Sequence, residues 1–119
     1  MVDVDALAQR AADYGFAYLI SITPSGRVHT SVVHPGIGDG AVTVPASDRV
    51  RRNVGENPQV SLVWPPADAT GYSLIADGVG DEKDGIVTIT PSRAILHRPA
   101  TEPSVPGAAD GCVQDCVEL

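Results

Sequence analysis

The chain has 119 residues and a formal charge of −7, which indicates a single acidic domain. Because general nucleic-acid binding and adsorption to anionic membranes both require a basic face, we expect neither partner. No apolar run reaches the roughly 18 residues that cross a bilayer, and the acidic start of the chain, MVDVDALAQR, lacks the pattern of a secretory signal. We therefore expect a cytoplasmic protein.

The first part of the chain predicts one helix followed by short strands. Apolar residues recur at helical spacing over residues 4–11, and Gly15 is the expected end of that helix. Residues 17–23 and 27–33 are rich in strand formers and are separated by a Pro-Ser-Gly turn. A third strand is predicted at residues 41–45, where a proline ends it.

A second helix is predicted near residues 48–55. Ser47 or Asp48 can cap its N-terminus, since both side chains accept hydrogen bonds from free backbone N–H groups. Val50 and Val54 are spaced i, i+4 and so lie on one face that can pack against a core. We therefore expect a short helix with a single buried edge.

The rest of the chain predicts further strands. They lie at residues 59–64, 72–79 and 85–90, while residues 92–98 fit either a last strand or a helical turn. Gly78 is the expected site of a bulge or a close approach of two backbones. Trp64 ends a strand before two prolines, and we expect it to pack in the core or at a dimer interface.

Six short strands, two short helices and frequent turns predict a mainly β fold, a small six-stranded β-barrel with helices at its ends. The connections are too short for repeated βαβ units. We divide the chain into a barrel domain, residues 1–98, and an extended C-terminal tail, residues 99–119. A disulfide between Cys112 and Cys116 in the tail is geometrically possible if the tail turns as a helix. The alternative is two exposed thiols, which are too few for a structural zinc site.

Arg49, Arg51 and Arg52 form a cationic cluster just after the start of the second predicted helix. Free N–H groups at a helix N-terminus favour an anion, and guanidinium groups match phosphate oxygens. Arg49 and Arg52 share a helix face at i, i+3, whereas Arg51 points elsewhere. The alternative is a solvated face on which the arginines pair with Asp48 and Glu56.

The order and spacing of these motifs resemble the flavin-binding split β-barrel superfamily, the pyridoxamine 5′-phosphate oxidase-like proteins, over about residues 5–98. The resemblance rests on the strand at residues 43–46, on Ser-Asp-Arg-Val at residues 47–50 and on Asn-Pro-Gln-Val-Ser-Leu at residues 57–62. Residues 91–98 resemble the closing segment of the F420 (deazaflavin)-dependent reductase branch. The resemblance implies a split barrel that forms a homodimer and binds F420 or FMN in the groove between the two subunits.

Carried over position by position, the resemblance implies a cofactor site built from the second strand, the third strand and the second helix. The implied cofactor-binding residues are His29, Ser31, Val44, Pro45, Ala46, Ser47, Arg49, Arg52 and Asn53. The ring would lie along the end of the third strand, flanked by the two side chains of the second strand, and the phosphate would lie at the helix start. No catalytic side chain is assigned, because the cofactor carries the reaction. No histidine pair has metal-ligand spacing, so we expect no metal site.

Three departures from the family pattern bear on the reaction. Val50 stands where the oxidase proper has a basic residue, Asp48 adds a negative charge near the phosphate, and the arginine-rich substrate segment of the oxidases is missing. We therefore do not expect vitamin B6 oxidation.

We expect a hydride transfer between F420 or FMN and a small-molecule substrate. The alternatives on the same fold are a non-catalytic carrier or sensor of a flavin, a deazaflavin or haem, and a barrel that binds nothing. The salt-bridge partners of Asp48 distinguish a barrel that binds a phosphorylated cofactor from one that binds nothing. Salt bridges from Asp48 to Arg49 and Arg52 would neutralise the phosphate site.

Overall fold

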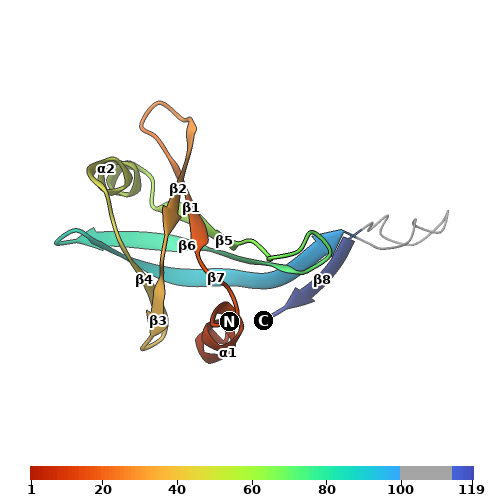
Figure 1. Ribbon diagram of the computed structural model, residues 1–119. Helices are drawn as coiled ribbons and strands as arrows, with labels where there is room; N and C mark the ends of the chain where they lie inside the picture. The colour runs from red at the N-terminus through yellow and green to blue at the C-terminus, as the bar shows by residue number, and fades with distance from the viewer. Residues whose placement is uncertain (100–113) are drawn as a thin grey trace.

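The computed structural model describes residues 1–99 and 114–119, which form two helices and one curled antiparallel sheet (Figure 1). No helix among these residues is long and apolar enough to cross a membrane. In chain order the elements are α1 (Val4–Ala11), β1 (Ala17–Ile22), β2 (Val28–Val33), β3 (Gly36–Gly38), β4 (Ala41–Pro45), α2 (Asp48–Glu56), β5 (Gln59–Trp64), β6 (Ser73–Lys83), β7 (Ile86–Pro99) and β8 (Gln114–Glu118).

The sheet has the strand order β2-β1-β5-β6-β7-β4-β3, and β8 also pairs with β7. Every pairing is antiparallel. β7 is long enough to serve two partners on one edge, because its first residues pair with β4 and its last residues pair with β8. In Figure 1, β6 and β7 run along the molecule as one long hairpin, and β1 to β4 cross it. This half-barrel confirms the mainly β split-barrel fold expected from the sequence.

The inward faces of the strands form the core. Burial alternates along β1, β4 and β5, as a half-buried sheet requires. At Gly78 the register of β6 against β7 shifts, which confirms the expected bulge. A Cβ atom on Gly78 would lie 2.5 Å from the carbonyl oxygen of Thr90, so only glycine fits at this position.

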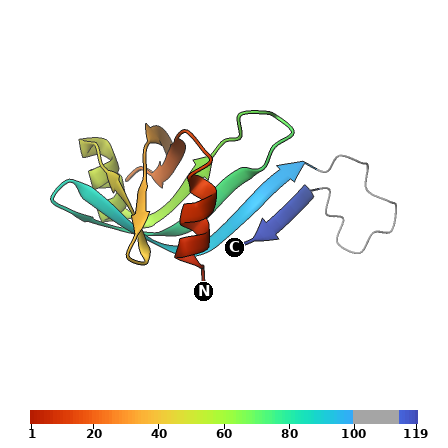
Figure 2. The same cartoon turned by 60° about the horizontal axis from the view of Figure 1, so that its bottom comes forward.

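α1 packs against β3 and lies between β3 and the C-terminal end of β8 (Figure 2). It begins after Asp3, whose carboxylate accepts a hydrogen bond from the backbone N–H of Ala6 at 3.1 Å. It ends at Ala12, earlier than the stop expected at Gly15. Leu7 is fully buried and anchors the helix to the core.

α2 packs against β1 and β6. It is capped by Ser47, whose Oγ accepts a hydrogen bond from the backbone N–H of Val50 at 3.3 Å. Val50 and Val54 are buried, as their spacing predicted. The arginines of α2 are therefore left on its exposed surface.

Two strands are additions to the six that the sequence predicted. β3 has three residues, two of them glycine, so no alternation reveals it. β8 lies within the segment expected to be an extended tail, and it pairs along the end of β7. Residues 92–98, for which a strand or a helical turn was open, continue β7. Cys112 lies outside the described residues.

Candidate functional site

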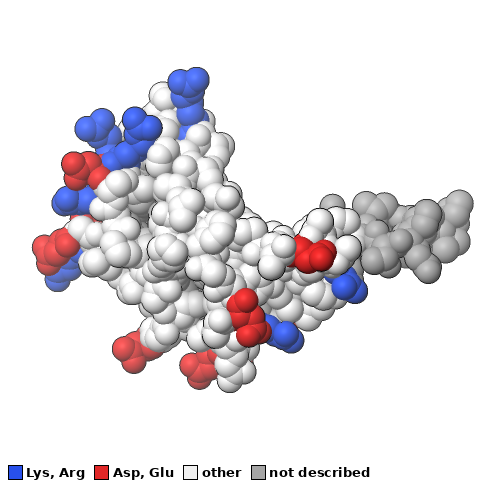
Figure 3. All heavy atoms as spheres, in the orientation of Figure 1, with Lys and Arg blue, Asp and Glu red and all other residues white. Residues whose placement is uncertain are grey.

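A cationic cavity of about 290 Å³ lies between α2 and the tip of the β1–β2 hairpin. Its lining residues are Thr23, Pro24, Ser25, Arg27, Arg49, Arg52 and Asn53. No Asp or Glu is among them. Figure 3 shows Lys and Arg side chains gathered over α2 and the hairpin tip. We name this hollow the arginine cavity.

Arg51 is held away from the arginine cavity. Its Nε donates a hydrogen bond to Glu82 Oε1 at 2.9 Å, and its Nη1 lies 3.7 Å from Asp48 Oδ1. Within residues 1–99 and 114–119, neither Arg49 nor Arg52 forms an ion pair. Asp48 therefore faces Arg51, and the salt bridges that would neutralise Arg49 and Arg52 are not formed.

The Glu82 carboxylate fixes the position of Arg51. Glu82 Oε1 also accepts a hydrogen bond from the backbone N–H of Gly85 at 3.0 Å. This N–H, and then the guanidinium of Arg51, hold the pKa of Glu82 below its ordinary value. The carboxylate is therefore charged at neutral pH and keeps Arg51 turned toward β6.

Sequence reasoning missed Arg27. It directly follows the hairpin turn at Gly26, whose φ of 84° lies in the left-handed region that favours glycine. Only the folding of the hairpin toward α2 brings Arg27 into the same cavity as Arg49 and Arg52. An arginine beside a tight turn is a weak signal, because such residues are most often solvated.

Asn53 joins α2 to the sheet. Its side chain is 1% exposed, and its Nδ2 donates a hydrogen bond to the Oγ of the fully buried Ser21 on β1 at 3.0 Å. A buried hydrogen bond of this kind specifies one position of the helix against the strand. It therefore sets where the side chains of Arg49 and Arg52 leave the helix.

His29 and Ser31 lie on the same face of β2, opposite Ser21 and Leu19 of β1. His29 Nδ1 and Ser31 Oγ are inaccessible to solvent and have no hydrogen-bond partner among the described residues. Buried polar atoms are nearly always partnered, because an unmade hydrogen bond costs free energy. Both atoms therefore stand out as unpaired polar atoms on the interior face of β2, and neither residue lines the arginine cavity.

The four predicted residues at the end of β4 and the start of α2 differ in burial. Val44 is fully buried in the core, whereas Pro45 is exposed. Ala46 is half-buried, and its N–H donates to the carbonyl oxygen of Gly85 at 2.9 Å. Ser47 is exposed and caps α2, but it does not line the arginine cavity. The structure thus places the predicted residues in three locations: the interior face of β2, the end of β4 and the cavity beside α2.

Cys116 is exposed, and its Sγ lies 3.2 Å from Nδ1 of His97 on the neighbouring strand β7. In the part of the chain that the structure describes, no three His, Cys, Asp or Glu side chains are grouped to hold a metal ion.

Sequence comparison identifies close relatives of this chain. No protein-family model matches it. An uncharacterised protein of Mycobacterium bovis and one of Mycobacterium tuberculosis are each 40% identical to it over 133 aligned positions. Both alignments cover 98% of this chain and 93% of the relative. At this identity and coverage the three proteins share one fold.

Three solved structures share the architecture. An F420 reductase aligns with a TM-score of 0.57 at 12% identity, covering 66% of this chain and 87% of its own. A protein of the pyridoxine phosphate oxidase family from Clostridium acetobutylicum aligns with a TM-score of 0.64 at 10% identity, covering 99% and 97%. A heme-binding protein from Mycobacterium smegmatis aligns with a TM-score of 0.62 at 19% identity, covering 91% and 54%. Identities this low show a common fold and no more. The chain therefore belongs to the family of the two mycobacterial proteins and has the split-barrel fold of the pyridoxamine 5′-phosphate oxidase-like superfamily.

Proposed function

We propose that the protein is a homodimeric oxidoreductase that binds F420 or FMN and transfers a hydride between that cofactor and a small-molecule substrate. The observation that carries this proposal is the arginine cavity, which three arginines and no Asp or Glu line. F420 and FMN both carry a phosphate group, which guanidinium groups bind with charge-assisted hydrogen bonds. When bound, the cofactor supplies the hydride chemistry.

The residues of the arginine cavity fit a phosphate. Arg49 and Arg52 lie on one face of α2, and Arg27 approaches from the hairpin. All three arginines are exposed, so an anion between them would gain charge-assisted hydrogen bonds without any carboxylate competing from the lining. Ser47 and the start of α2 add a helix N-terminus on the same side of the protein.

We assign the ring of the cofactor to the interior face of β2 and the end of β4. His29 Nδ1 and Ser31 Oγ are buried and unpartnered among the described residues, so they suit the polar edge of a ring. Pro45 and Ala46 would offer an apolar surface and backbone groups to the ring face. The role of these residues is to bind, to orient and to exclude water.

A second copy of the chain is the partner that this proposal requires. Tyr18, Val28, Val32 and Val79 are exposed apolar side chains. Tyr18 lies opposite Val32, and Ile22 lies opposite Val28 in the β1–β2 register, so the outward face of this hairpin is apolar. An apolar sheet face of this kind favours an interface. Val32→Glu should therefore shift the protein from dimer to monomer in size-exclusion chromatography with light scattering.

The proposal is tested by titrating the apo-protein with F420 and, separately, with FMN, followed by cofactor absorbance and by the fluorescence of Trp64. Arg49→Gln and Arg52→Gln should each weaken binding by about 10- to 150-fold, since a hydrogen bond to a charged group contributes about 1.5–3 kcal/mol. The matched control is Arg10→Gln on α1, which does not line the arginine cavity. Equal affinity of all three variants would remove the arginine cavity from the cofactor site.

The second candidate is a haem-binding carrier or sensor, and the unpartnered Nδ1 of His29 favours it. A histidine nitrogen is a common axial ligand of haem iron. Addition of haem should then give a Soret band that His29→Gln shifts or abolishes. A Soret band that depends on His29, together with no binding of F420 or FMN, would replace the oxidoreductase proposal. No binding of any of the three would leave the arginine cavity as a solvated surface.

A further inference from the structure

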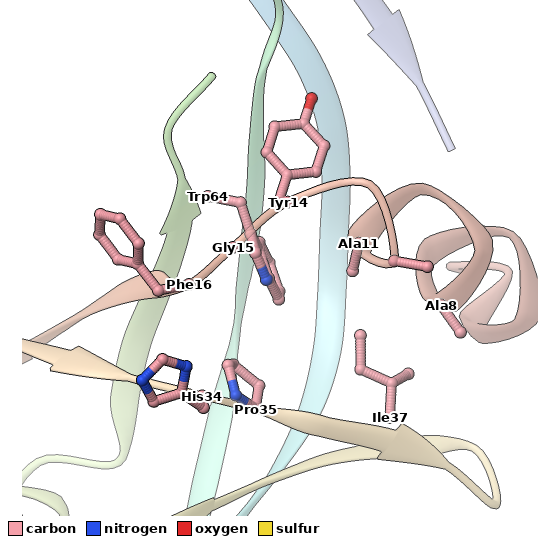
Figure 4. A pocket seen from close by; sticks show the side chains of 10 residues that line it. Ala8, Ala11, Tyr14, Gly15, Phe16, His34, Pro35, Ile37 and Trp64 are labelled. Atoms are coloured by element: carbon pink, nitrogen blue, oxygen red, sulfur yellow. The ribbon is translucent and has the colours of Figure 1, made fainter. Parts of the chain in front are cut away.

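A small hollow of about 230 Å³ lies between α1, the residues that lead into β1, the start of β3 and the end of β5 (Figure 4). Its lining residues are Ala8, Ala11, Ala12, Tyr14, Gly15, Phe16, His34, Pro35, Ile37 and Trp64. None of them lines the arginine cavity or belongs to the proposed cofactor site. We name it the tryptophan hollow.

Trp64 brings to this hollow an indole N–H from which no described residue accepts a hydrogen bond. The residue is 3% exposed, and none of the described residues accepts a hydrogen bond from its indole N–H. Figure 4 shows the ring nitrogen at the end of the indole that faces Pro35 and Ile37, inside the hollow. A buried tryptophan N–H usually finds an acceptor, because leaving it without one costs free energy. The hollow therefore offers one hydrogen-bond donor to an acceptor atom of a ligand or of water.

The tryptophan hollow is lined by uncharged side chains and by His34. No Asp, Glu, Lys or Arg lines it, and Ala8, Ala11 and Ile37 form an apolar side. An ionised group placed against this apolar side would lose its hydration without gaining a counter-charge there. A neutral acceptor such as a carbonyl oxygen pays a smaller desolvation cost. The volume lies below the roughly 300–1,000 Å³ of pockets for drug-sized ligands, so the bound group is small.

We propose that the tryptophan hollow binds a small uncharged carbonyl compound, whose oxygen accepts a hydrogen bond from the indole N–H of Trp64 and whose apolar body packs against Ala8, Ala11 and Ile37.

A larger neighbouring hollow of about 800 Å³ gives such a ligand room to extend. The two hollows share Tyr14, Gly15 and Phe16. The larger one is lined by all three tyrosines and the single phenylalanine of the chain, so both hollows together contain every aromatic residue of the protein. The Tyr14 hydroxyl donates to the carbonyl oxygen of Tyr72 at 2.7 Å and holds its ring between them. Arg10, Asp13 and Asp68 also line the larger hollow, so a carbonyl compound with an aromatic extension would find both rings and charged groups there.

The indole signal of the isotope-labelled full chain in a proton–nitrogen correlation spectrum tests this proposal. Trp64 is the only tryptophan, so the signal is unambiguous. The two probes are cyclohexanone and methylenecyclohexane, which has a similar shape but no acceptor oxygen. We expect cyclohexanone to shift the indole proton downfield in a saturable way and to bind roughly two- to tenfold more tightly than methylenecyclohexane.

Two substitutions on α1 test whether the shift of the indole signal arises from binding in the tryptophan hollow. Ala8→Leu fills the hollow and should abolish the shift, whereas Gln9→Leu adds the same side chain at an exposed position and should preserve it. Equal affinity for the two probes, or a shift that rises linearly without saturation, would overturn the proposal on the unmodified protein. A folded Ala8→Leu variant that still shows the saturable shift would also overturn it.

Discussion

Replacing Asn53 by leucine tests whether one buried hydrogen bond positions α2. Asn53 Nδ2 donates to Ser21 Oγ at 3.0 Å, and both side chains are almost completely buried. Leucine has the same number of side-chain heavy atoms and the same branching at Cγ as asparagine, so the change removes the polar groups while it keeps the shape of the side chain. The Ser21 hydroxyl would then remain in the interior without its donor.

The expected magnitude follows from the cost of an unmade hydrogen bond. Asn53→Leu and Ser21→Ala should each lower the free energy of unfolding by about 1–3 kcal/mol. In the double variant neither group remains unpaired, so its cost should fall short of the sum by about 1 kcal/mol or more. Urea denaturation of the four proteins measures this, and the slope of the transition should stay unchanged.

The hydrogen bond between Asn53 and Ser21 should also affect the affinity for the cofactor, because it sets the position of α2. Because Asn53 sets the position of Arg49 and Arg52, Asn53→Leu should also weaken F420 or FMN binding without removing any charge. If the two single changes add to within about 0.5 kcal/mol of the double, the side chains are not energetically coupled. That result would refute the role we give to this contact.

Three further predictions concern stability. Gly78→Ala should lower the free energy of unfolding by about 1–3 kcal/mol, because the added Cβ would lie 2.5 Å from a backbone carbonyl oxygen; an unchanged melting temperature would contradict the bulge geometry. Removing residues 114–119 should lower the melting temperature, since it uncovers the end of β7; identical thermal curves would show that β8 adds nothing to stability. The Gly85 N–H, and then Arg51, lower the pKa of Glu82, so the folded state binds fewer protons in acid than the unfolded chain does. This group therefore stabilises at neutral pH and loses its effect as pH falls below its ordinary pKa of about 4.3. Glu82→Gln should lower stability at neutral pH and flatten its decline in acid, and an unaltered decline would contradict this assignment.

Local sequence was enough to predict most of the fold. The alternation of residues in β1, β4 and β5 and the valine pair on α2 depend only on neighbours a few positions away. The spacing of Arg49 and Arg52 likewise predicted that both would share one helix face, and they line one cavity. β3 and β8 could not be found in this way, because a three-residue strand and an edge strand carry too little periodicity.

The sequence by itself determined the mainly β class, the capped helix with its arginines and the glycine at the bulge. Each of these follows from the steric and hydrogen-bonding preferences of residues close together in the chain. Only the tertiary structure decided that Arg27 joins Arg49 and Arg52, that Asn53 bonds to Ser21, and that the aromatic residues surround two adjoining hollows. These contacts join segments far apart in the chain, so they exist only once the sheet has curled and brought those segments together.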